Sequence, residues 1–130
     1  MSTILIDTKT LSQKPNRVTL RRLAGQVSDG QGRDIGLDRE VWVSLFGEVG
    51  TSADTNLTGS LDAVEVLRRL LLPGSGIRVF KMPSEDDWVA EMLLVEGDEW
   101  ELGEMLPRAK ARTELRARLA ALLMAIATTL

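Results

Sequence analysis

The segment from residue 88 to 95 constrains the fold more than any other, because it has strand length and is apolar on both faces. Its apolar residues are Trp88, Ala90, Met92 and Leu94 on one face and Val89, Leu93 and Val95 on the other. Only Glu91 interrupts this pattern. Because successive strand residues point to opposite faces, such a strand needs cover on both sides. We therefore predict that helices pack on both faces of the sheet that contains it.

Two further segments complete a predicted antiparallel β-meander around this strand. Residues 77–82 precede it and residues 99–105 follow it, and the connections at 83–86 and 96–98 are short and polar. Connections of this kind are typical of β-hairpins. Residues 1–16 hold one short apolar stretch, which predicts an N-terminal extension or a fourth strand at the edge of the sheet.

Four helices are predicted from the spacing of apolar residues and from capping residues. They cover residues 18–27, 37–46, 60–71 and 113–126. Ser60 and Thr113 have side chains that cap helix starts, and Pro73 follows the third helix. The fold class is therefore α+β, with a small antiparallel meander of about three strands sandwiched by helices. A chain of 130 residues fits one domain, which we place at residues 17–130.

The composition narrows the classes of function. The chain has no Cys and no His, which excludes thiolate zinc sites, cysteine nucleophiles and catalytic triads built on His. We therefore expect neither an enzyme nor a cofactor. A net charge of −3 argues against a general nucleic-acid binder, which neutralises phosphates with Lys and Arg. The first residues do not resemble a secretory signal, and the longest apolar run, residues 119–127, is far shorter than the roughly 20 residues of a membrane span. We expect a cytoplasmic protein.

Three stretches carry a resemblance to a known family. Residues 20–47 predict two short helices joined by a Gly-containing loop, residues 57–64 have the sequence Leu-Thr-Gly-Ser-Leu-Asp-Ala-Val, and residues 109–123 lead into a helix rich in Ala and Leu. With these features the segment 20–127 resembles the phage ABA sandwich domain proteins, which are small uncharacterised proteins of phages and prophages.

The resemblance has limits and few implications. Proteins of the family usually have an aromatic residue where this chain has Leu57 and a Pro-containing entry near the place of Arg112, and residues 1–15 lie outside the likeness. The resemblance implies helices that sandwich an antiparallel sheet, and it implies a protein that acts in the cytoplasm of a bacterial host. It implies almost nothing about chemistry.

An acidic segment is the first candidate site. Of the 19 carboxylates in the chain, 9 lie between Glu85 and Glu104, with no Lys or Arg among them. Asp86, Asp87 and Glu91 can converge on a magnesium or calcium ion, because hard cations bind several oxygen ligands. No EF-hand spacing supports this site, and a solvated face of the sheet is the favoured interpretation. An acidic surface for a partner is the third alternative.

A basic segment and the tryptophans are the other candidates. Arg108, Lys110 and Arg112 lie close to a predicted helix start, so they can bind a small phosphate-bearing molecule. The favoured alternative is that they pair with the acidic segment, in one subunit or across a dimer. Trp42, like Trp88 and Trp100, can stack on a ligand ring or anchor the core.

These observations favour a non-enzymatic phage or prophage accessory protein that acts by binding. It would inhibit a host protein, for example one that serves in defence, or sequester a small ligand. A phage structural or assembly protein that acts as an oligomer is the first alternative, and a metal-dependent enzyme at Asp86, Asp87 and Glu91 is a poorly supported second one. Because the last predicted helix is apolar beyond one stripe, a homo-oligomer is favoured slightly over a monomer.

Overall fold

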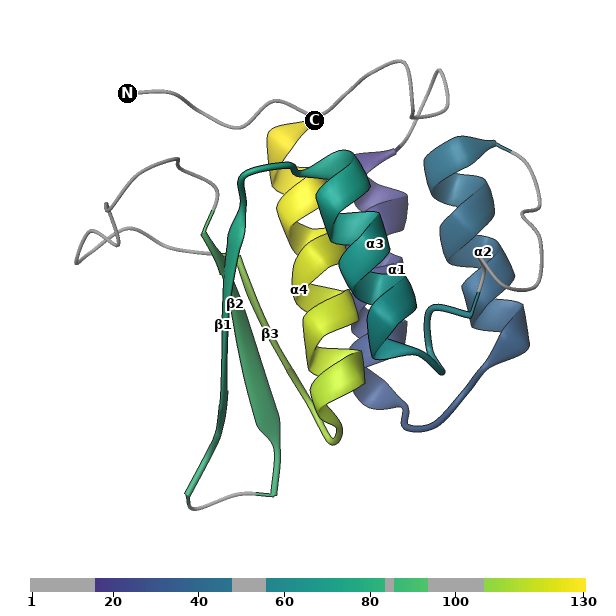
Figure 1. Cartoon of the computed structure of the whole chain (residues 1–130). Coiled ribbons are helices and arrows are strands. Elements are labelled where there is room, and N and C mark those ends of the chain that lie inside the picture. Colours follow the sequence, from purple (N-terminus) through teal and green to yellow (C-terminus); the bar gives the residue numbers. More distant parts are fainter. Residues whose placement is uncertain (1–15, 48–55, 84–85, 94–106) are drawn as a thin grey trace.

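A polar residue caps the start of each of four helices. The side chains of Asn16, Asp34, Ser60 and Thr113 accept hydrogen bonds from backbone N–H groups of the first helical turns. The computed structural model describes residues 16–47, 56–83, 86–93 and 107–130 (Figure 1). Its elements, in chain order, are α1 (Arg17–Asp29), α2 (Ile35–Phe46), α3 (Leu61–Leu71), β1 (Gly76–Lys81), β2 (Trp88–Leu93), β3 (Arg108–Ala111) and α4 (Glu114–Thr129).

The three strands form one antiparallel sheet in the order β1-β2-β3. Phe80 of β1 lies opposite Val89 of β2, which in turn lies opposite Lys110 of β3. The predicted first and second strands are therefore present. The predicted third strand at 99–105 lies outside the described residues, as does the N-terminal segment, and the strand at 108–111 was not predicted.

Helix α4 is the centre of the structure. It lies between the sheet and the other helices, and it packs against α1, α3 and all three strands (Figure 1). Ten of its residues are buried, and five of these are alanines. A helix in this position is apolar on most of its surface because it has neighbours on most sides. Contacts within one subunit therefore explain why α4 is so apolar, and no dimer is needed to explain it.

The expectation of helices on both faces of the sheet needs correction for the described part of the chain. All four helices lie on the same side of the sheet (Figure 1). Ala90 and Met92 of β2 point into the core on that side. Val89 and Leu93 are buried on the second face, and Val89 lies there between Phe80 of β1 and Lys110 of β3. A strand that is apolar on both faces requires cover, but long side chains of adjacent strands also supply cover.

An α+β fold with helices packed on a small antiparallel sheet is confirmed. Buried apolar residues from all four helices and from the sheet form one continuous core. Among the described helices, none combines the length and the apolar character that crossing a membrane requires.

Candidate functional site

The acidic and basic segments pair with each other where the structure describes them. The carboxylate of Glu91 is buried on the second face of the sheet, 3.1 Å from Nη2 of Arg78 and 3.6 Å from Nη2 of Arg108. Nζ of Lys110 lies 3.8 Å from the carboxylate of Asp87. These ion pairs fit the favoured alternative, in which the basic segment neutralises the acidic one within one subunit.

The predicted phosphate site is only partly assembled. Lys110 and Arg112 line one hollow of about 410 Å³, but Asp29 and Asp87 line the same hollow. Arg108 lines a different hollow together with Lys110, beside Phe80 and Val89 on the second face of the sheet. Two carboxylates therefore offset the two cations, which weakens the attraction for a phosphate.

The predicted metal ligands do not form a cluster in the described part of the chain. No three acidic side chains gather there as a metal site requires. Asp86 is exposed in the turn before β2, and Glu91 already lies between two arginines. A carboxylate with two guanidinium partners is a poor ligand for a cation, because the positive charges around it repel the ion.

Trp42 lies at a groove between α2 and α3. It is half-buried, and its ring centroid is 4.5 Å from that of Phe46 one turn later. Helix α2 packs against α1, α3 packs against α4, and α2 and α3 do not pack against each other (Figure 1). The space between them is a groove of about 260 Å³, lined by Trp42, Ser60, Asp62, Ala63, Val66, Leu67 and Leu70. Trp100 lies outside the described residues.

The groove exposes apolar side chains to solvent. Val66 is 64% exposed and Leu70 is 45% exposed, both on the face of α3 that lines the groove. Leu67, deeper in the same wall, is buried in the core. The apolar surface of α3 is therefore wider than its packing against α4 requires. A contiguous apolar patch with a polar rim is typical of a binding surface.

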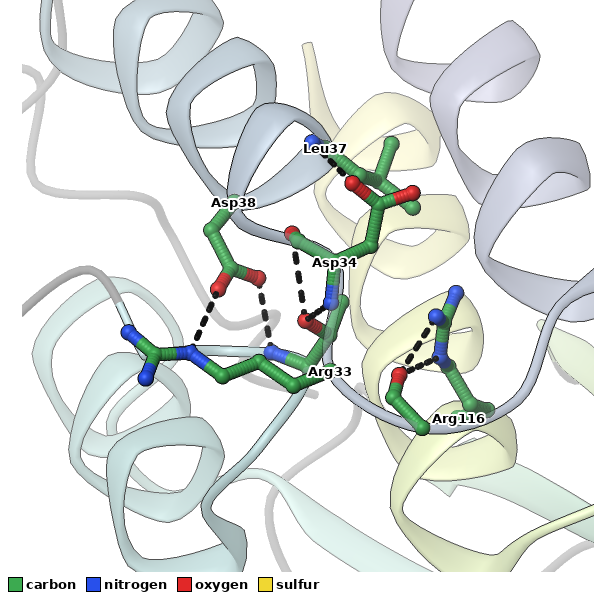
Figure 2. A network of polar contacts seen from close by, with 7 residues as sticks. Arg33, Asp34, Leu37, Asp38 and Arg116 are labelled. Carbon is green, nitrogen blue, oxygen red and sulfur yellow. Dashed lines mark hydrogen bonds and ion pairs between the residues drawn. The ribbon is translucent and has the colours of Figure 1, made fainter.

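A polar network joins the start of α2 to the turn before α3 (Figure 2). The backbone N–H of Thr58 donates to Oδ1 of Asp38 at 2.8 Å, and the N–H of Asp34 donates to Oγ1 of Thr58 at 2.7 Å. Asp38 is 1% exposed. Because Asp34 and Asp38 belong to the start of α2 and Thr58 to the turn before α3, the network sets the distance between the two walls.

Arg33 and Gly59 complete this network. Nε of Arg33 lies 4.0 Å from Oδ2 of Asp38, an oxygen that accepts no hydrogen bond from a described residue. The methylene groups of Arg33 pass close to Gly59, where a Cβ atom would lie 3.2 Å from them and 2.3 Å from Oδ1 of Asn56. A larger residue at position 59 would therefore displace the side chains of Asn56 and Arg33.

Arg116 connects the network to the central helix. Its Nε and Nη2 donate to the carbonyl oxygen of Gly32 at 3.1 and 2.6 Å (Figure 2). Its Nη1 donates to the carbonyl oxygen of Val27 at 3.2 Å. Arg116 thereby caps one carbonyl in the last turn of α1 and holds the connection between α1 and α2. The sequence indicated Arg116 only as one member of the basic segment, and it did not indicate Asp38 or Thr58 as partners.

Glu65 and Arg68 form a second polar group, on the other side of α3. Nε of Arg68 donates to Oε2 of Glu65 at 2.9 Å. This hydrogen bond lowers the pKa of Glu65, and the charges of Arg68, Arg69 and Arg118 lower that pKa further against the opposing effect of burial. The carboxylate therefore stays ionised below the pH at which a free Glu takes up a proton.

Comparison of the chain with protein-family models, curated proteins and solved structures found no match. The arguments on function therefore rest on the geometry of this chain.

Proposed function

We propose that this protein acts by binding, without catalysis, and that the groove between α2 and α3 receives an apolar segment of a partner protein. The observation that carries the proposal is the exposure of Val66 and Leu70 beside the half-buried ring of Trp42. Full burial of a Val or Leu side chain contributes about 1.5–3 kcal/mol. Aromatic rings in such positions are frequent anchors of protein interfaces.

An amphipathic helix is the segment that suits this groove. Helix α3 supplies most of the lining and Trp42 of α2 stands opposite, and a helix fits such a groove with apolar residues at every third or fourth position. Asp62 lines the groove and forms no ion pair with any described residue. A partner helix that carries a basic residue near Asp62 would therefore be favoured over one that carries an acidic residue.

The biological setting of the proposal rests on the family resemblance. Residues 57–64, which carry much of that resemblance, supply the turn at Thr58 and the N-cap of α3 at Ser60, and both position the groove. We propose a phage or prophage accessory protein that inhibits a protein in the cytoplasm of its bacterial host. Sequestration of a small phosphate-bearing ligand at Lys110 and Arg112 is the weaker form, because Asp29 and Asp87 line the same hollow.

The proposal can be tested by capturing host proteins from a lysate, with the wild type and two matched variants as the immobilised proteins. Val66→Asp places a charge in the groove, and Val18→Asp makes the same change at a valine of α1 that is 72% exposed and outside the groove. We expect the wild type and Val18→Asp to retain the same protein, and Val66→Asp to retain about tenfold less or none. Equal capture by both variants would contradict the groove, and no captured protein at all would contradict the inhibition of a host protein.

A further inference from the structure

The outer edge of β1 presents backbone groups that bond to no described residue. The N–H of Met82 donates to the carbonyl oxygen of Asp87 at 3.0 Å, which fixes the bonding pattern of the ladder between β1 and β2. In an antiparallel ladder the residues that bond to the neighbour alternate with residues whose N–H and C=O point away. The groups that point away from the sheet belong to Ile77, Val79 and Lys81. No described residue forms a hydrogen bond with them.

The opposite edge of the sheet differs. The same alternation directs the carbonyl of Lys110 away from β2, and this carbonyl accepts a hydrogen bond from Oγ of Ser28 in α1. Helix α1 packs beside β3 along this edge. Helix α1 thus covers the outer edge of β3. No described residue covers the outer edge of β1. An open edge strand is a template for another strand.

We propose that β1 of a second copy of this chain pairs with β1, so that two three-stranded sheets become one sheet of six strands. The strands run antiparallel about a twofold axis at Val79. Val79 then lies opposite Val79 of the second copy, and Ile77 lies opposite Lys81 of the second copy. Ile77, Val79 and Lys81 are the residues whose backbone groups point outward. Each pair that they form across the twofold axis can therefore make two N–H···O bonds.

The side chains of β1 select this register. It places Arg78 opposite Phe80 of the second copy, which allows a cation–π contact and avoids like charges. A register centred on Lys81 would place two lysines directly opposite each other. A register centred on Ile77 would use Ser75, whose N–H already donates to Leu72 and whose carbonyl already accepts from Arg68.

This pairing leaves the groove accessible. Helices α2 and α3 are parts of the helical layer, and β1 lies at the edge of the sheet (Figure 1). A dimer formed at β1 would therefore carry two grooves and could hold a partner at two points. The dimer does not depend on the proposed function, since it rests on the hydrogen-bonding pattern of the sheet.

Cysteine cross-linking tests the register, because the chain has no cysteine of its own. In the proposed pairing the two Cα atoms at position 79 lie about 5.5 Å apart, within the range of a disulfide. The two copies of Ile77 lie about 14 Å apart, since four strand residues separate Ile77 from Lys81. We expect Val79→Cys to form a disulfide-linked dimer on mild oxidation. Ile77→Cys alone and Lys81→Cys alone should not form a linked dimer. An equal mixture of these two variants should form one.

Cross-linking of Ile77→Cys as fast as Val79→Cys would contradict the register. Analytical ultracentrifugation of the cysteine-free chain tests the dimer itself, with an expected mass of about twice 14.3 kDa at tens of micromolar. Val79→Asp places two carboxylates opposite each other and should give a monomer. Because Val79 also packs against the core, a circular dichroism spectrum like that of the wild type is the control for folding. Val66→Asp should remain a dimer, which separates this interface from the groove. A wild-type monomer at 100 micromolar would overturn the proposal.

Discussion

Arg116 in α4 donates two hydrogen bonds to the carbonyl oxygen of Gly32, which lies 84 residues earlier in the chain. The guanidinium is almost completely buried, and its third bond goes to Val27 at the end of α1. The central helix therefore holds the connection from which α2 begins. Because α2 forms one wall of the groove, this contact joins the core of the protein to its candidate binding surface.

Arg116→Ala should destabilise the protein by about 2–4 kcal/mol, because it leaves the buried carbonyl of Val27 and the carbonyl of Gly32 without this donor. Arg118→Ala is the matched control. Arg118 forms a half-exposed ion pair with Glu114 one turn away, and its loss should cost less than about 1 kcal/mol. Urea unfolding at pH 7 measures both values. Equal losses for the two variants would refute the assigned role of Arg116.

Asp38→Ala should reduce the free energy of unfolding by about 1–3 kcal/mol, because the N–H of Thr58 loses its buried acceptor. Asp38→Asn keeps an oxygen that can accept this bond and should therefore lose less. Thermal or urea unfolding of the two variants gives the comparison. Equal losses for the two variants would mean that the charge of Asp38, and not its acceptor oxygen, stabilises the turn.

The contribution of Glu65 should depend on pH. Its pKa is lower in the folded protein than the ordinary value of 4.5, mainly because of the hydrogen bond from Arg68. The folded state therefore gains stability above pH 4.5, and this gain disappears as the pH falls through the lowered pKa. We expect Glu65→Gln to be about 0.5–1 kcal/mol less stable than the wild type at pH 7, since the pair is partly exposed. Urea unfolding should show that the difference in free energy of unfolding between the two proteins shrinks below pH 4.5. A difference that stays constant down to pH 3 would contradict this explanation.

The groove should tolerate changes that the core does not. Val66→Asp should alter the free energy of unfolding by less than about 0.5 kcal/mol, because the side chain is mostly exposed. Leu67→Ala, one residue further along α3, should cost about 2–5 kcal/mol because Leu67 is buried. Chemical unfolding of both variants measures the contrast. Similar losses would mean that Val66 contributes to folding and not to a free surface.

Local signals in the sequence predicted most of the elements. Ser60 caps α3 as expected, Thr113 caps α4, and the first two strands begin within one residue of their predicted positions. The start of α2 was predicted at Leu37, two residues late, because the capping role of Asp34 was not recognised. Strand β3 was missed because its four residues, Arg-Ala-Lys-Ala, include no β-branched or aromatic residue.

The sequence could not predict how distant residues meet. The apolar pattern of β2 required cover on two faces, but it could not distinguish a covering helix from the side chains of adjacent strands. The acidic segment followed by a basic one predicted ion pairs such as Lys110 with Asp87, whereas nothing in the chain indicated that Asp38 would accept from Thr58. The groove itself arises because α2 packs on α1 and α3 on α4, which is a property of the tertiary arrangement.

Nuclear magnetic resonance of the ¹⁵N-labelled chain, titrated with the protein that it captures, tests the central claim most directly. The account predicts that the indole N–H signal of Trp42 and the backbone amide signals of Ala63, Val66 and Leu70 shift on binding. Signals of β3 and of Arg112 should stay in place. Shifts at β3 and Arg112, with no change at Trp42 and α3, would contradict the groove as the binding surface.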